Sequence, residues 1–151
     1  AGHPARLVAY KGERPLVFDV PHFEAALEWL AALRPDGSLS LADQVDGVRG
    51  ALGSGSFLCC VAPAARFDYG RLASSLPPMC RVALVLVDQA SHNGNGAARG
   101  DRDPALETIS DLAGAPFAGL FSVSLYRKGD DLRECLEKPL IIFGDYQSRE
   151  R

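Results

Sequence analysis

Two nearly unbroken apolar runs constrain the fold of this chain more than any other feature. They are SFLCCVA at 56–62 and RVALVLVD at 81–88, and each has the length of a strand rather than of a helix. Strands that are apolar at successive positions are typical of a parallel sheet with both faces covered. We therefore expect both runs to be buried between helices. The adjacent Cys59 and Cys60 would then point to opposite faces of one central strand, and we interpret them as core packing.

Helix and strand patterns alternate around these two runs. Helices are expected at 22–35, 40–52, 65–76, 104–114 and 130–137, and further strands at 5–10, 15–20 and 119–126. This alternation with short connections indicates an α/β fold, Rossmann-like in its three layers, with a mainly parallel sheet and helices on both faces. The first two strands predict an N-terminal antiparallel hairpin that adds an edge to that sheet. We expect one domain over 1–138 and a C-terminal extension over 139–151.

Charge and composition exclude several classes of function. The formal net charge is −3 over 151 residues, whereas broad nucleic-acid binding usually needs a basic face. No apolar run reaches the roughly 18 residues of a membrane span. The chain has no Cys-x-x-Cys motif and no histidine pair at ligand spacing, so we expect reduced cysteines, no metal site and a cytoplasmic setting. No glycine pattern of a nucleotide site is present, and no cofactor is expected.

The long polar stretch at 88–103 is the best candidate for a functional loop. It would leave the carboxyl end of a parallel strand, where α/β proteins bind ligands, and it is longer than most such connections. Its candidates for acid–base chemistry are Asp88, His92 and Asp101. The alternative interpretation is a surface insertion without a catalytic role, and the chain has no G-x-S-x-G motif of a hydrolase nucleophile.

Several phrases, taken in their order, resemble a known bacterial family. They are AGHPARLVAY, FEAALEWLAALRPDGSLSLADQV, GSFLCCVAP, RVALVLVD and YRKGDDLRECLE, and together they span Gly2 to about Glu137. This part of the chain is similar to the C-terminal part of the "domain of unknown function 58" family, whose members look like von Willebrand factor A domains. The resemblance implies a protein-interaction module, with a MoxR-type AAA ATPase as a partner. It also implies a place at the inner face of the membrane, within a longer anchored protein.

The chain departs from the von Willebrand A pattern at the metal site. The Asp-x-Ser-x-Ser motif is absent, and Asp145 to Ser148 has a different spacing. We therefore expect no intact metal site and a fragment of a longer protein that lacks the first, central strand. The vacancy in the sheet would be filled by 139–143 or by another chain. The first hypothesis is a non-enzymatic protein-binding module, and the alternative is a small hydrolase or ligand-binding enzyme that uses the 88–103 loop.

Overall fold

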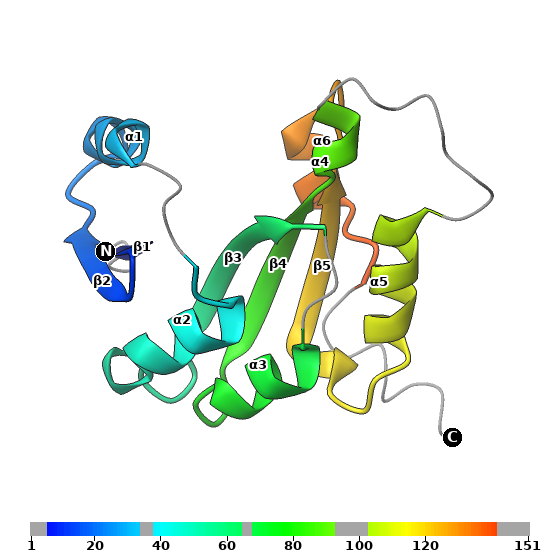
Figure 1. The fold of residues 1–151 in the computed structure, drawn as a ribbon, viewed down its shortest axis with the longest axis horizontal. Helices are drawn as coiled ribbons and strands as arrows, with labels where there is room; N and C mark the ends of the chain where they lie inside the picture. Colours follow the sequence, from blue (N-terminus) through cyan, green and yellow to red (C-terminus); the bar gives the residue numbers. More distant parts are fainter. Residues whose placement is uncertain (1–5, 34–37, 65–67, 93–102, 142–151) are drawn as a thin grey trace.

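The two apolar runs are neighbouring strands of one parallel sheet. The computed structural model describes residues 6–33, 38–64, 68–92 and 103–141. The sheet consists of β3 (Phe57–Pro63), β4 (Arg81–Val87) and β5 (Phe121–Tyr126), in the order β3-β4-β5. Cys60 pairs with Leu84, which in turn pairs with Val123. The α/β class and the parallel sheet are therefore confirmed (Figure 1).

Three helices share a core with one face of this sheet. They are α2 (Leu41–Val48), α3 (Tyr69–Ser75) and α5 (Pro104–Ala113). Because the strand order follows the chain order, right-handed crossovers place α3 and α5 on the same face. The core joins these helices to alternate residues of the strands, and its largest fully buried members are Leu72, Leu84, Leu86, Leu112 and Phe121.

The other face is covered unevenly, and the prediction of helices on both faces is wrong at β3. Phe57 is 64% exposed and Val61 is 69% exposed, and Cys59 between them is also exposed. On the same face Val85 of β4 and Ser124 of β5 are each only 6% exposed. The two-sided burial predicted for 81–88 is thus found on β4. It fails on β3 because β3 is an edge strand rather than the central one.

The N-terminal hairpin forms a separate sheet, which corrects the expectation that it adds an edge to the parallel one. Strand β1 (Arg6–Lys11) pairs with β2 (Arg14–Asp19) across a turn in which Gly12 has a φ of 57°. Phe18 of β2 stacks on Trp29 of α1 (Phe23–Ala32), with ring centroids 5.5 Å apart. In Figure 1 the hairpin and α1 lie beside the body that contains the parallel sheet.

The hairpin is attached to α2 rather than to β3. The Tyr10 hydroxyl donates a hydrogen bond of 2.6 Å to the carbonyl of Gln44. A Cβ atom at Gly47 would lie 2.5 Å from that hydroxyl oxygen, so only glycine permits this approach. The hydrogen bond between the Tyr10 hydroxyl and the Gln44 carbonyl holds the hairpin against α2.

The remaining elements are short. They are the 3₁₀ turns η1 (Arg49–Ala51) and η2 (Ala118–Leu120), helix α4 (Gln89–His92) and helix α6 (Leu132–Glu137). Helix α4 occupies the start of the predicted 88–103 loop, and 93–102 lie outside the described residues. In the described part of the chain, no helix combines the length and hydrophobicity that crossing a membrane requires.

After α6 the chain returns along the outer edge of β5. Ile141 forms an isolated antiparallel bridge with Val123, whose N–H donates to the Ile141 carbonyl at 2.9 Å. In this register Pro139 lies opposite Leu125, and proline has no N–H to continue the ladder. Of the expected strand at 139–143, one bridged residue is therefore observed, and 142–143 lie outside the described residues. The bridge lies at the edge of the sheet, and the described strands β3, β4 and β5 pair directly, so the expected vacancy is not found between them.

Candidate functional site

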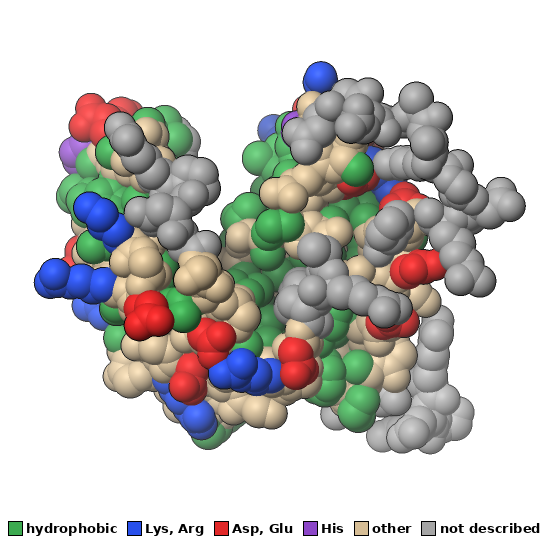
Figure 2. Space-filling model, viewed as in Figure 1, with side chains coloured by type: hydrophobic (Ala, Val, Ile, Leu, Met, Phe, Trp, Pro, Cys, Tyr) green, Lys and Arg blue, Asp and Glu red, His purple; other side chains and the backbone are tan. Residues whose placement is uncertain are grey.

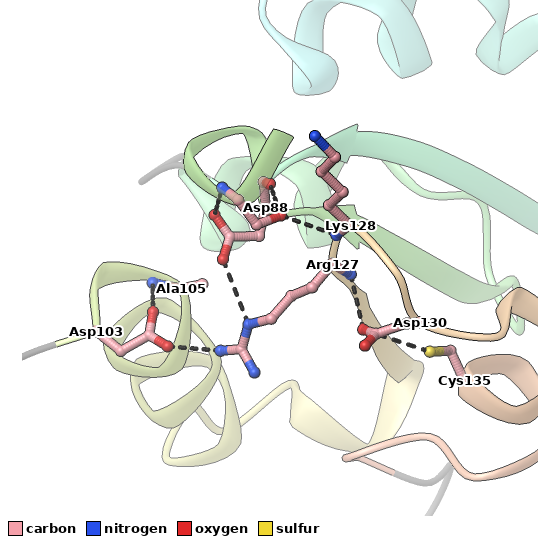
Figure 3. Close-up of polar contacts among 8 residues, drawn as sticks. Asp88, Asp103, Ala105, Arg127, Lys128, Asp130 and Cys135 are labelled. Carbon is pink, nitrogen blue, oxygen red and sulfur yellow. Dashed lines mark hydrogen bonds and ion pairs between the residues drawn. The ribbon is translucent and has the colours of Figure 1, made fainter. Parts of the chain in front are cut away.

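Charged side chains meet where β4 and β5 end, at the carboxyl edge of the parallel sheet. Asp88 follows β4 directly and Arg127 follows β5. The Arg127 guanidinium donates through Nε to Asp88 at 3.3 Å and through a terminal nitrogen to Asp103 at 2.5 Å. Asp103 is the N-cap of α5, where its carboxylate also accepts from the backbone N–H of Ala105. One arginine thus joins two strand ends to a helix start (Figure 3).

Backbone hydrogen bonds brace this arrangement. Asp88 accepts from the N–H of Ser91 through its side chain, while the Ser91 hydroxyl donates to the Asp88 carbonyl at 2.6 Å. The same hydroxyl accepts the N–H of Lys128 at 2.9 Å. Asp130 accepts the N–H of Arg127 at 2.8 Å and so closes the turn after β5. The side chains are therefore positioned by the two loops that leave the sheet.

The chemistry of this cluster is that of a shielded ion-pair network. The Asp88 side chain is 8% exposed and that of Asp103 is 17% exposed. Each oxygen of the Asp88 carboxylate already accepts a hydrogen bond, one from Ser91 and one from Arg127. These contacts link the ends of β4 and β5 through the Asp88 carboxylate.

Of the three predicted acid–base candidates, Asp88 and His92 lie in the described part of the chain. Asp88 is directed toward Arg127 and the start of α5 (Figure 3). His92 is exposed, and its ring lies 5.8 Å from the ring of Tyr126. Asp101 lies outside the described residues. The hydrolase alternative therefore stays a prediction.

Sequence reasoning identified the correct segments but missed the residue that joins them. Arg127 opens the RKGDD stretch that follows a predicted strand, and Asp103 precedes a proline at a helix start. The available signal was Asp88 and Arg127 at the carboxyl ends of parallel strands, with Asp103 at a helix start. Among the described residues, no group of three His, Cys, Asp or Glu side chains is arranged to hold a metal ion.

The cysteines that interrupt the first apolar run differ in their surroundings. Cys60 is buried, and burial, with a smaller effect of the neighbouring thiols of Cys59 and Cys80, raises its pKa to about 12. Cys59 is exposed on the other face, which corrects its interpretation as core packing, and partial burial still raises the pKa of its thiol. Both thiols are therefore protonated near neutral pH, a state unsuited to nucleophilic attack or metal binding. All four cysteines lie in the described ranges and none forms a disulfide.

The exposed side of β3 is the second candidate region. Its exposed residues, Phe57, Cys59, Val61 and Pro63, alternate along the strand and carry no charge. The outer edge of β3 pairs with no strand of the described part of the chain. Figure 2 shows a hollow between the hairpin with α1 and the body, with hydrophobic side chains along its wall beside β3.

Comparison with known proteins adds no relative. No family, no curated protein and no solved structure matches this chain. Functional conclusions therefore rest on the residues themselves.

Proposed function

We propose that this chain is a non-catalytic α/β module of von Willebrand A-like fold that binds a protein partner through β3. The observation that carries the proposal is the exposure of Phe57 and Val61 on a strand of a parallel sheet. Strands of such sheets are normally covered on both faces, and an exposed apolar surface of this kind is typical of an interaction site. The surface lacks charge along its length, so its preferred partner is another apolar surface.

The outer edge of β3, which pairs with no described strand, gives the partner a second means of attachment. Edge strands present backbone N–H and C=O groups that pair readily with another strand. Natural edges are commonly protected by charged residues or proline, and β3 has only Pro63 at its last position. A partner that adds a strand beside β3 and covers Val61 would satisfy both features.

The identity of the partner is proposed from the sequence resemblance alone. The phrases that resemble the "domain of unknown function 58" family favour a MoxR-type AAA ATPase, in a bacterial complex at the inner face of the membrane. The module would act by recruitment, since the carboxylates at the sheet edge are engaged in ion pairs.

A matched pair of surface substitutions tests the role of β3. Val61→Lys places a charge on the proposed surface, and Val17→Lys makes the same change on β2, where Val17 is 53% exposed. We expect V61K to weaken binding to a purified MoxR-type ATPase of the same organism at least about tenfold, because a lysine buried without a partner is costly. V17K should bind like the unmodified chain in the same interferometry assay.

The outcomes distinguish an error in the proposed binding surface from an error in the proposed partner. Equal binding by both variants would show that β3 is not the contact surface. No binding by the unmodified chain would exclude this class of ATPase while leaving the exposed β3 surface to be tested with a different partner.

A further inference from the structure

A cavity lies at the opposite edge of the sheet from β3, between β5, α5 and α6. Its volume is about 630 Å³, within the range of about 300–1,000 Å³ typical of ligand pockets. Leucines contribute its apolar lining: Leu125 of β5 is 8% exposed, whereas Leu106 of α5 and Leu140 are 48% and 56% exposed. The cavity therefore combines a buried apolar contact with two apolar side chains that an occupant could cover.

Three carboxylates, Asp130, Asp131 and Glu134, contribute to the polar lining of the cavity. Two cations also line it, but each is engaged: Lys138 pairs with Glu134 at 2.7 Å, and Arg127 with the two aspartates at the strand ends. Asp130 and Asp131 have no cationic partner among the described residues. Asp130 accepts a backbone N–H and the thiol of Cys135 (Figure 3), and Asp131 caps α6. Among the described residues, two negative charges at the cavity are thus without a positive partner.

The carboxylates also act on the nearby thiol of Cys135. The pKa of Cys135 is raised by desolvation and, in addition, by the charges of Asp130, Asp131 and Glu134. A region that disfavours a further negative charge favours a positive one. The occupant that fits the cavity therefore has both a cationic group and an apolar part.

We propose that this cavity binds a peptide segment of a protein partner in which a lysine or arginine adjoins a leucine-sized side chain. The cation would lie against Asp130 and Asp131, and the apolar side chain would cover Leu106 and Leu140. This site is at the far edge of the sheet from β3, so it stands or fails independently of the function proposed for that strand.

The test uses a fluorescein-labelled Leu-Lys-Leu-Lys-Leu-Lys peptide and, as a neutral probe, Leu-Gln-Leu-Gln-Leu-Gln. Binding to the whole chain is measured by fluorescence anisotropy. The variant D130N/D131N removes both charges but keeps acceptors for the Arg127 N–H and for the α6 cap, since asparagine caps helices as well as aspartate. The matched control E24Q/E28Q makes the same change of net charge on α1.

We expect the lysine peptide to bind D130N/D131N about fivefold more weakly than the unmodified chain, because one exposed ion pair contributes up to about fivefold in affinity. E24Q/E28Q should change the affinity less than about twofold. Leu106→Gln, at an exposed position of α5, should weaken both peptides. Equal weakening by the two charge variants would overturn the proposal, as would equal affinity for the two peptides or no binding of the lysine peptide at millimolar concentration.

Discussion

Replacing Gly47 by alanine tests how the N-terminal hairpin is held against α2. Alanine stabilises a helix by up to about 1 kcal/mol relative to glycine, so helix propensity alone predicts a more stable protein. The structure predicts the opposite, because the new Cβ would lie 2.5 Å from the Tyr10 hydroxyl oxygen. The hydroxyl must then leave the Gln44 carbonyl, to which it donates at 2.6 Å.

The magnitude follows from these contacts. Loss of the hydrogen bond costs about 1 kcal/mol, and displacement of the tyrosine ring by the added methyl group costs about 1 kcal/mol more. Set against the gain in helix propensity, Gly47→Ala should lower the free energy of unfolding by about 1 kcal/mol. With Tyr10→Phe already present, the nearest ring atom is 3.6 Å from the new Cβ, an ordinary contact. Gly47→Ala should then raise the free energy of unfolding by up to about 1 kcal/mol.

Urea unfolding of the unmodified chain, the two single variants Gly47→Ala and Tyr10→Phe, and the double variant measures both effects. Trp29 is the single tryptophan of the chain and stacks on Phe18 of the hairpin, so its fluorescence reports on the hairpin and α1. Far-UV circular dichroism follows the whole fold. If Gly47→Ala stabilises the protein equally with tyrosine or phenylalanine at position 10, the close approach of Tyr10 to α2 is refuted.

Two further predictions concern the sheet. Arg127→Ala leaves Asp88 shielded without its cation and should lower the free energy of unfolding by about 2 kcal/mol, whereas Arg133→Ala, which breaks an exposed pair on α6, should cost less than about 0.5 kcal/mol. Similar losses for the two variants in urea unfolding would contradict the shielded network. The pKa of Cys60 is raised from 9.0 to about 12, so its contribution to stability is complete below pH 9 and is lost as the pH rises from 9 toward 12. The slope is up to about 1.4 kcal/mol per pH unit, and Cys60→Ala should flatten it. Unchanged pH dependence in that variant would show that the buried thiol does not titrate as described.

Strand positions were predictable, because the apolar runs at β3 and β4 are too short for helices and too apolar for loops. Helix starts were predictable where a side chain caps the backbone, as Ser40 does at α2. The exposure of one face of β3 was not predictable. The run SFLCCVA has the same apolar pattern whether that face is covered by another part of this chain or by a partner. A pattern of apolar residues records which faces avoid water in the working assembly, not which element covers them.

The predicted site was less accessible to sequence reasoning than the fold. Asp88 was identified from its place after a strand, but its ion pair with Arg127 joins residues 39 positions apart, and only the register of β4 against β5 brings them together. The attachment of the hairpin depends similarly on one tyrosine reaching one helix. Long-range side-chain contacts of this kind leave no periodic signal in the chain.

The Arg127 contacts have a practical consequence for engineering. Asp88 and Asp103 lie on either side of residues 93–102, and the guanidinium pins both flanks at a fixed separation. Where the ends of a connection are held in this way, doubling its length costs only about 0.6 kcal/mol of closure entropy. An insertion between Asp88 and Asp103 should accordingly cost little in closure entropy.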